Sequence, residues 1–540
     1  MSEPLRAAAP GNGGAPASRP GWFRWSVAAG IVLISSASLH VFYSRGLTDL
    51  YGDALAHMEG ARRLVDSLTP GYEEIGTAWL PLYHLVVAPL AIDDHLWRTG
   101  LAGSLVSTVA FAVAAWFVFR LGLEMNLNIE AGLAALAGFL LCANMLYTAA
   151  TPLTEPLAMM WAILVAYCLF RFSQRGTALA LVGAGFAAFF GVLTRYDGWF
   201  LLPFAALFVL LVPSGAWVVR LRRTILFSAI AGAAPVLWLA HNVHRFGNPI
   251  EFYNGPYSAQ AIYAHQVATT GFRYPTDGSW LLSLRYYVED CKLVMGVWLL
   301  ELALLGLIAW VVTRGERRRR AAALLLLVPL PFYVQSMAHA AVPIYVPTLF
   351  PHAYYNLRYG LEMLPAAALF PSFLIGARLS AGARRGLLAV ILAVVLGQNA
   401  SAVQRGLDEL PTVKESLLNT PCHTGTEQAL IRFFGANYDG RLIVLALGKY
   451  PCVLPALGIP YHQTLSEVNR VYWRQLRLGP AGWPAGSPLD SIGWIIRGAA
   501  DPVDELMRAY PDAFASFRKV EEYHFPDEEA VTVYRRESKP

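Results

Sequence analysis

Long apolar segments alternate with short polar ones over most of the chain. With its flanks, each apolar segment is long enough for a helix of roughly 20 residues that crosses a bilayer. The pattern therefore predicts a mainly α polytopic membrane helix bundle of about 11 transmembrane helices within residues 22–398, after a disordered cytoplasmic tail at 1–21. The eleven segments are Trp22–Tyr43, Thr99–Leu121, Ala131–Ala149, Leu157–Phe172, Ala178–Leu193, Trp199–Val212, Ile225–Ala240, Leu293–Val312, Ala321–Val334, Leu361–Ala377 and Leu387–Leu396.

The pattern changes in the C-terminal segment, residues 399–540. Short apolar stretches there have the length of buried strands, and helical patterns separate them, at Gln463–Leu476 and Asp501–Tyr510. Strands that alternate with helices predict a small soluble α/β domain. The predicted strands are Arg441–Leu447, Gly493–Arg497 and Ala530–Tyr534.

Composition and arginine placement support a membrane protein. Only 15% of the residues are charged and 56% are hydrophobic, whereas globular chains are about a quarter charged. Arginines gather before the first apolar segment and in alternate loops, which predicts a cytoplasmic N-terminus and an extracytoplasmic C-terminal domain. This clustering favours a topology signal over nucleic-acid binding. The arginines are Arg6, Arg19, Arg24, Arg120, Arg171, Arg175, Arg220, Arg222, Arg223, Arg314, Arg317–Arg320, Arg378, Arg384 and Arg385.

The first outer loop, residues 44–98, has unusual polar chemistry. Asp53 and His57 are four residues apart, so they share one face of a helix. Glu74, Trp79 and His84 follow a Thr-Pro-Gly turn that folds the second half of the loop back over the first. A polar loop of this length predicts a binding or catalytic loop.

Two acids are candidates for catalysis. A carboxylate that activates a hydroxyl must lie within hydrogen-bonding reach of it, and Asp53 lies near the outer end of the first apolar segment. The alternative is that Asp53 caps the helix that follows. Glu155 lies between Pro152 and Pro156 in TPLTEP; it is either a second acid in the same cavity or the charged end of a helix.

Further outer residues are candidates for substrate binding. Arg358 and Tyr359, before the tenth apolar segment, suit bidentate capture of a phosphate at headgroup level; snorkelling of the arginine to lipid headgroups is the alternative. Arg195 and Asp197, in TRYDGW, either bind substrate or pair with each other, and His241 either helps to hold an anion or is a polar helix end.

With these motifs in view, the chain resembles the polytopic glycosyltransferases of the GT-C fold. It is similar to the branch of protein O-mannosyltransferases and bacterial aminoarabinose lipid A transferases, a family 39-like group. The resemblance rests on Asp53 in the first outer loop, TEP at Glu155, LTRYDGW at Leu193–Trp199 and RYGLEMLP at Arg358–Pro365. One departure is that Ala54 follows Asp53, where that branch often has an Asp-Glu pair.

The resemblance implies a membrane glycosyltransferase of a bacterial inner or plasma membrane. It would move a sugar from a polyprenyl-phosphate donor to an extracytoplasmic lipid, glycan or protein, with inversion and with an Asp base. It leaves metal use open: Asp53, Glu155 and Asp197 could share a divalent ion, Mg²⁺ or Mn²⁺, or Asp53 could act alone. The alternatives from other classes are a non-catalytic transporter or flippase and a glycan-binding envelope protein.

The chain has five cysteines. Cys142 and Cys168 fall in apolar segments and are expected in the helical core. Cys422 and Cys452 both fall in the predicted outer domain, where oxidising conditions permit a disulfide between them.

Overall fold

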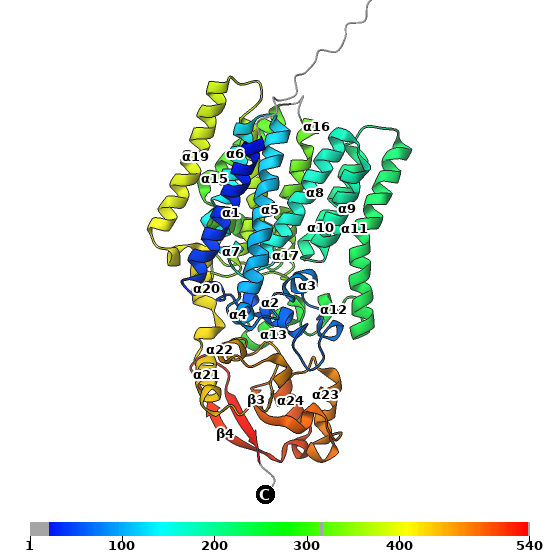
Figure 1. Cartoon of the computed structure of the whole chain (residues 1–540), viewed down its shortest axis with the longest axis vertical. Helices are drawn as coiled ribbons and strands as arrows, with labels where there is room; N and C mark the ends of the chain where they lie inside the picture. The colour runs from blue at the N-terminus through cyan, green and yellow to red at the C-terminus, as the bar shows by residue number, and fades with distance from the viewer. Residues whose placement is uncertain (1–20, 314–316, 538–540) are drawn as a thin grey trace, which may run out of the picture.

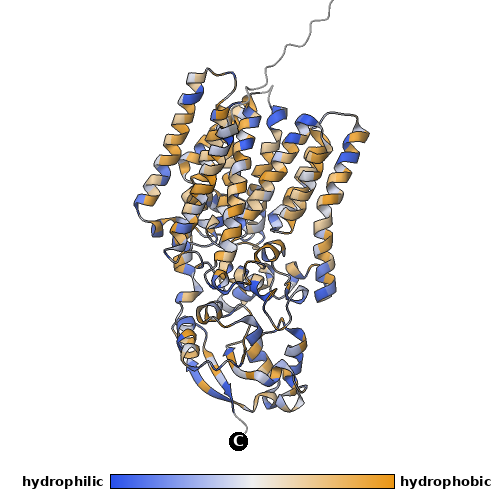
Figure 2. Cartoon of the chain, in the orientation of Figure 1, coloured by the Kyte–Doolittle hydropathy of each residue, from blue (hydrophilic) through white to orange (hydrophobic). Residues whose placement is uncertain are grey.

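The computed structural model describes residues 21–313 and 317–537, so the predicted tail at 1–21 lies almost wholly outside the described residues. A helical bundle forms one end of the molecule and a mixed sheet forms the other (Figure 1). Figure 2 shows that hydrophobic residues dominate the bundle and that polar residues gather at the ends of its helices. The bundle helices are α1 (Gly21–Tyr43), α5 (Leu101–Asn126), α6 (Ile129–Leu140), α7 (Ala143–Ala149), α8 (Glu155–Arg175), α9 (Ala178–Val192), α10 (Tyr196–Leu211), α11 (Trp217–Phe246), α14 (Trp280–Met295), α15 (Val297–Val312), α16 (Arg317–Arg320), η3 (Ala321–Leu327), α17 (Pro329–Ala338), η4 (Leu357–Met363), α18 (Leu364–Leu369), η5 (Phe370–Leu374) and α19 (Ala381–Gln404).

Every predicted apolar segment falls on helical structure, but not every segment is a full span. Among the described residues, six helices are long and apolar enough to cross a membrane, and the number rises to eight if each of two bent pairs is one span. The bent pairs are α6 with α7, at 66°, and α14 with α15, at 112°. By length and composition alone, six to eight of the eleven predicted segments thus form described helices that are long enough for a full span. The remaining segments form the shorter helices α9 and α10 and the succession η4, α18 and η5.

The first outer loop folds into short helices between the bundle and the C-terminal sheet (Figure 1). They are α2 (Gly52–Arg63), η1 (Tyr72–Glu74), α3 (Leu82–Val87) and α4 (Asp94–Arg98). Helix α3 packs against α2, so the second half of the loop returns over the first, as the Thr-Pro-Gly turn predicts. A second loop, with α12 (Glu251–Asn254) and α13 (Ala259–Thr270), lies at the same end of the bundle.

The C-terminal segment contains a five-stranded sheet in the order β2-β1-β3-β5-β4. Strand β1 pairs in parallel with β2 and β3, while β5 is antiparallel to both β3 and β4. The three predicted strands correspond to β1, β3 and β5, and the α/β prediction is confirmed. The strands are β1 (Leu442–Val444), β2 (Thr464–Leu465), β3 (Ile492–Gly498), β4 (Phe517–Tyr523) and β5 (Val531–Arg536), with helices α20 (Pro411–Asn419), η7 (Pro421–His423), α21 (Gly425–Asn437), α22 (Val453–Leu457), α23 (Arg470–Gln475) and α24 (Pro502–Ala509).

Strand β2 and strand β4 were not predicted. Strand β2 has only two residues, too few for a period to be seen. Strand β4 (FRKVEEY) is largely exposed and carries four charged residues among its seven, so it lacks the apolar pattern of a buried strand.

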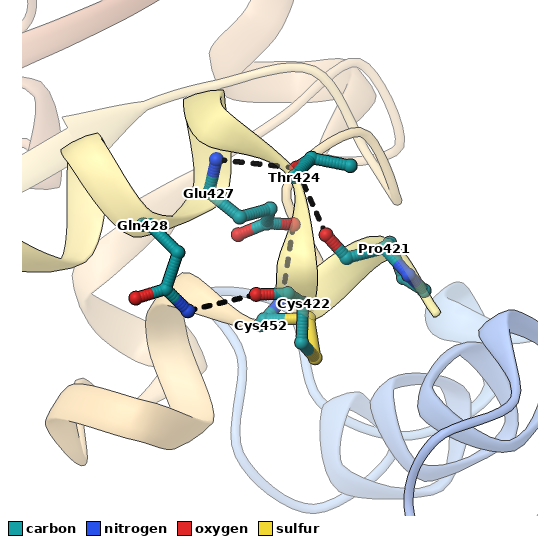
Figure 3. Close-up of a disulfide and its surroundings, with 6 residues drawn as sticks. All are labelled: Pro421, Cys422, Thr424, Glu427, Gln428 and Cys452. Atoms are coloured by element: carbon teal, nitrogen blue, oxygen red, sulfur yellow. Dashed lines mark hydrogen bonds between the residues drawn. A yellow bond between two sulfur atoms is a disulfide. The ribbon is translucent and has the colours of Figure 1, made fainter. Parts of the chain in front are cut away.

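A disulfide joins Cys422 and Cys452, which confirms the pairing that the sequence left open. It links η7 to the residue before α22 (Figure 3). The side-chain amide of Gln428 donates to the carbonyl of Cys422, and the amide N–H of Cys452 donates to the Glu427 carboxylate. The segment after the last bundle helix is therefore fixed covalently to the sheet domain.

Candidate functional site

Five segments that are distant in the sequence bring ionisable groups together at the end of the bundle that faces the sheet domain. We define the central cluster as Asp53, Glu155, Arg195, Arg358 and Glu415. Asp53 lies in the first turn of α2, Glu155 begins α8 and Arg195 precedes α10. The positive ends of helix dipoles favour carboxylates in first turns, so both acids lie where their charge is stabilised.

Arg358, on η4, lies among three carboxylates. Its Nη2 donates to Asp53, its Nε donates to Glu155 Oε1 at 2.9 Å, and its Nη1 lies 3.8 Å from Glu415 Oε1. Arg358 is only 3% exposed. A buried arginine needs paired acids, and this one holds together side chains from α2, α8 and α20.

Arg195 forms the second cationic centre of the cluster. Its Nη1 donates to Glu155 Oε1 at 3.1 Å and to Thr154 Oγ1 at 2.8 Å. The Tyr359 ring lies between the two guanidinium groups, 4.7 Å from that of Arg358 and 5.0 Å from that of Arg195. The predicted site residues Glu155, Arg195, Arg358 and Tyr359 are therefore in mutual contact.

The two candidate acids differ in their access to solvent. The side chain of Asp53 is 42% exposed, whereas that of Glu155 is 1% exposed. Asp53 is also not the N-cap of α2, since Tyr51 occupies that position without a side-chain cap bond. Asp53 therefore has a carboxylate that a substrate hydroxyl can reach, while Glu155 is placed to orient both arginines.

Glu415 is a member of the cluster that the sequence reasoning missed. It lies on α20, beyond the predicted end of the membrane domain, and accepts from the backbone N–H groups of Asn356 and Leu357 and from the Tyr51 hydroxyl. Burial raises the pKa of Glu415 to about 7, against the lowering effect of the Arg358 guanidinium. In the sequence, the only sign of Glu415 is that it is a charged residue in the stretch after α19. Many surface acids share this property, so it does not identify a site residue.

His57 and His84 form a pair one helical turn from Asp53. His57 Nδ1 lies 2.9 Å from His84 Nε2, and the ring of Trp79 lies 4.5 Å from that of His57. Burial lowers the pKa of both imidazoles, that of His84 to about 4. The pair is therefore neutral near pH 7, with one ring donating to the other, and Trp79, 40% exposed, covers its outer side.

Glu74 and His241, also predicted to bind substrate, lie in contacts that hold the loop in place. Glu74 accepts from Ser67 and Thr69 and from Asn469 of the sheet domain. His241 lies 2.8 Å from the Tyr72 hydroxyl, and its other ring nitrogen donates to the Gly76 carbonyl. The structure does not place either residue against the central cluster, and their polar atoms are engaged by the protein itself.

Asp197 lies at the edge of the cluster, with Oδ1 3.8 Å from Arg195 Nε. The residues that the structure describes contain no group of three His, Cys, Asp or Glu side chains arranged to hold a metal ion. Asp53 and Glu155 bind guanidinium groups, which already supply the positive charge that a cation would bring. A Mg²⁺ or Mn²⁺ shared by Asp53, Glu155 and Asp197 therefore stays a prediction from the sequence, and the arginine contacts of Asp53 and Glu155 weigh against it.

No protein-family profile and no curated protein sequence matches the chain. The structure is similar to the crystal structure of ArnT from Cupriavidus metallidurans bound to undecaprenyl phosphate, with a TM-score of 0.50 and 14% identity over 96% of this chain and 98% of that one. The chain has the ArnT fold. The apo form of the same protein gives a TM-score of 0.48 at 14% identity, over 94% and 98% of the two chains.

The ArnT fold agrees with the GT-C resemblance that the motifs indicate, and the fold prediction is confirmed. Nearly the whole of both chains is covered, so the likeness includes the C-terminal domain as well as the bundle. The chain is a multi-pass membrane protein with this fold. At 14% identity the likeness concerns the fold, and the chemistry has to be argued from the cluster itself.

Proposed function

We propose that the chain is an inverting membrane glycosyltransferase, which moves a sugar from a polyprenyl-phosphate donor to an extracytoplasmic acceptor. The observation that carries the proposal is the half-exposed carboxylate of Asp53, held by Arg358 in an otherwise buried cluster of an ArnT fold. The ArnT crystal structure contains undecaprenyl phosphate, which supports a polyprenyl-phosphate donor here.

The chemistry needs one accessible carboxylate. A free oxygen of Asp53 accepts the proton of the acceptor hydroxyl while the acceptor oxygen bonds to the anomeric carbon. The bond from that carbon to the phosphate oxygen breaks, and the polyprenyl phosphate leaves with the electron pair. The Arg358 guanidinium orients Asp53, and Glu155 holds Arg358 and Arg195 in place.

Arg358 as the ligand of the donor phosphate stays a prediction from the sequence. In the structure, the nitrogens of Arg358 face Asp53, Glu155 and Glu415, so a phosphate would have to compete with these acids. We therefore propose that Arg358 acts mainly by positioning Asp53. The substitution Arg358→Lys distinguishes this role from phosphate binding.

An ion-coupled transporter is the second candidate, because the bundle buries more acid than the sequence suggested. Glu362 on η4 and Asp290 on α14 are 3% and 0% exposed. Acids buried in a membrane domain are often part of an ion or proton path. The two candidates differ in product: only a transferase makes a new glycosidic bond.

The proposal is tested by sugar transfer with Asp53→Asn. Purified protein is supplied with radiolabelled polyprenyl phosphates that carry hexoses or pentoses and with cell-envelope fractions as acceptors. General-base assistance is worth about 10²–10⁴-fold in rate, so the variant should transfer sugar more slowly by that factor and still bind donor.

The matched control for that assay is Asp93→Asn. Asp93 caps α4 in the same loop, and asparagine caps about as well as aspartate. This variant should transfer at the wild-type rate. Wild-type transfer by Asp53→Asn would remove Asp53 as the base and direct attention to Glu155 and then Asp197. Absence of transfer by the wild-type protein from every donor would favour the transporter.

A further inference from the structure

A cavity of about 700 Å³ lies at the end of the bundle opposite the central cluster. Its lining comes from the last turns of α5 and α8, the starts of α1, α6 and α19, and α16. Helix α8 begins at Glu155 in the cluster and ends beside this cavity at Arg175. Its 21 residues span about 30 Å, close to the thickness of a bilayer core, so the cavity lies at the opposite membrane surface.

The charge of this cavity is strongly positive. Six arginines and two glutamates, Glu124 and Glu130, line it, which leaves an excess of four positive charges. The sequence analysis interprets the arginines on this face as a topology signal. That signal requires only that arginines lie on one side of the membrane, and it does not require them to line the same cavity. The six are Arg24, Arg120, Arg171, Arg175, Arg319 and Arg384.

Glu124 orders two of these arginines from different helices. Arg120 Nε donates to Glu124 Oε1 at 2.9 Å, and Arg171 Nη1 donates to Oε2 at 2.8 Å. The Tyr167 hydroxyl donates to the same carboxylate at 3.1 Å. One carboxylate neutralises one guanidinium and fixes both, so the pair keeps a net positive charge in a preset geometry. Preset guanidinium groups are the ligands best suited to phosphate oxygens.

The walls of the cavity are apolar. Phe119 and Leu123 of α5 and Phe170 of α8 line it together with the arginines. An occupant that satisfies both surfaces has a phosphate beside apolar groups, as a lipid headgroup does where it joins its acyl chains. A wholly polar anion would leave the exposed Leu127 and the half-buried Leu123 and Ile129 of the lining without an apolar partner.

We propose that this cavity is a phosphate-binding site at the membrane surface, filled by the headgroup of an anionic phospholipid. The shared chemistry is a phosphate group, and the source is either a lipid or free phosphate. The site is separate from the central cluster, so it does not rest on the proposed glycosyl transfer. It would anchor α5, α8 and α19 to the membrane surface on which the arginines gather.

The test compares two double variants that remove the same charge. Arg171→Gln with Arg175→Gln removes two cavity arginines. The matched control is Arg222→Gln with Arg385→Gln, which removes two exposed arginines at the same end of the bundle that do not line the cavity. Binding of phosphatidylglycerol to each full-length protein in detergent is measured by native mass spectrometry, with phosphatidylcholine as the zwitterionic comparison.

Each arginine near an anionic lipid is worth about 1 kcal/mol, or roughly fivefold in affinity. The cavity variant should therefore bind phosphatidylglycerol at least fivefold more weakly than the control variant. An equal loss of affinity for phosphatidylglycerol in both variants would show that the lipid is attracted by the overall positive charge, and it would overturn the proposal. No loss of affinity in either variant would also overturn it. If the double variant does not fold, Arg175→Gln alone, at an exposed position, is compared with Arg222→Gln by the same criterion.

The source of the phosphate is decided in the same titration. Displacement of phosphatidylglycerol by millimolar inorganic phosphate supports a site that takes the free anion. Retention of the lipid supports the headgroup, because the apolar walls then contribute to binding. Both results keep the phosphate site, and neither depends on whether the protein transfers sugar.

Discussion

Arg358 and Asp53 are 305 residues apart in the chain, and the guanidinium group of Arg358 donates directly to the Asp53 carboxylate. The same arginine also binds Glu155, which is 1% exposed. One buried cation thus connects the proposed base, at the membrane surface, with the first turn of a bundle helix. The position of the Asp53 carboxylate therefore depends on Arg358.

Arg358→Lys separates the two roles considered for this arginine. Lysine keeps the charge but has one ammonium group, which does not reach three carboxylates at once. If Arg358 positions Asp53, donor affinity should stay near wild type while the transfer rate falls by roughly 10²-fold, the cost of a misplacement of about 1 Å. Donor affinity is measured by titration with a labelled polyprenyl-phosphate sugar, and transfer in the same preparation.

The opposite result identifies Arg358 as the phosphate ligand. Donor affinity would then fall strongly, since the planar guanidinium fork suits a phosphate better than an ammonium group does. Arg405→Lys, at an exposed position after the bundle, is the matched control and should change neither quantity. Wild-type affinity and wild-type rate for Arg358→Lys would exclude both roles.

Glu415 should make stability depend on pH. Its pKa in the folded protein is raised to about 7 from 4.5, so between these values the folded state holds a proton that the unfolded state releases. The stability that this group contributes is therefore full below pH 4.5 and is lost as pH rises through 7. Thermal melts of wild type and Glu415→Gln at pH 5, 6, 7 and 8 should show the advantage of wild type shrinking with rising pH, and parallel curves would contradict this prediction.

Much of the fold followed from the sequence because its signals are local. An apolar segment predicts a helix by length alone, and every such segment is helical here. Bends were not predictable, since the 66° and 112° breaks depend on packing against other helices. A count of full spans therefore required the structure.

The site was predictable where motifs placed residues on the same membrane face. Asp53, Glu155, Arg195 and Arg358 do meet, because each lies at or near the end of an apolar segment that faces the sheet domain. Glu415 was not predictable, since its position follows from how α20 packs against α7 and η4. The loop contacts of Glu74 and His241 likewise depend on partners that no local pattern indicates.

The His57–His84 pair should make the protein sensitive to acid. The pKa of each imidazole is lowered in the folded state, so the unfolded state binds more protons once the pH falls below about 6.5. Stability should therefore decline as pH falls from about 6.5 towards 4. Because the His84 ring is hydrogen-bonded to the His57 ring, His84→Gln should flatten that decline in thermal melts. An unchanged slope would assign the acid sensitivity to other groups.

The Cys422–Cys452 disulfide should support both stability and the site. It closes a loop with a sequence separation of 30, and bonds of this kind are worth about 2–4 kcal/mol. The linked segment also reaches the cluster, since Pro421 packs beside Gly52, the residue before Asp53. Cys422→Ser with Cys452→Ser should therefore lower the melting temperature and slow sugar transfer.

Cys168→Ser, at a free cysteine in the bundle, controls for loss of a thiol and should leave transfer unchanged. A double variant with lower melting temperature but wild-type transfer would show that the bond stabilises the sheet domain without positioning α2, whereas an unchanged melting temperature would contradict the prediction outright.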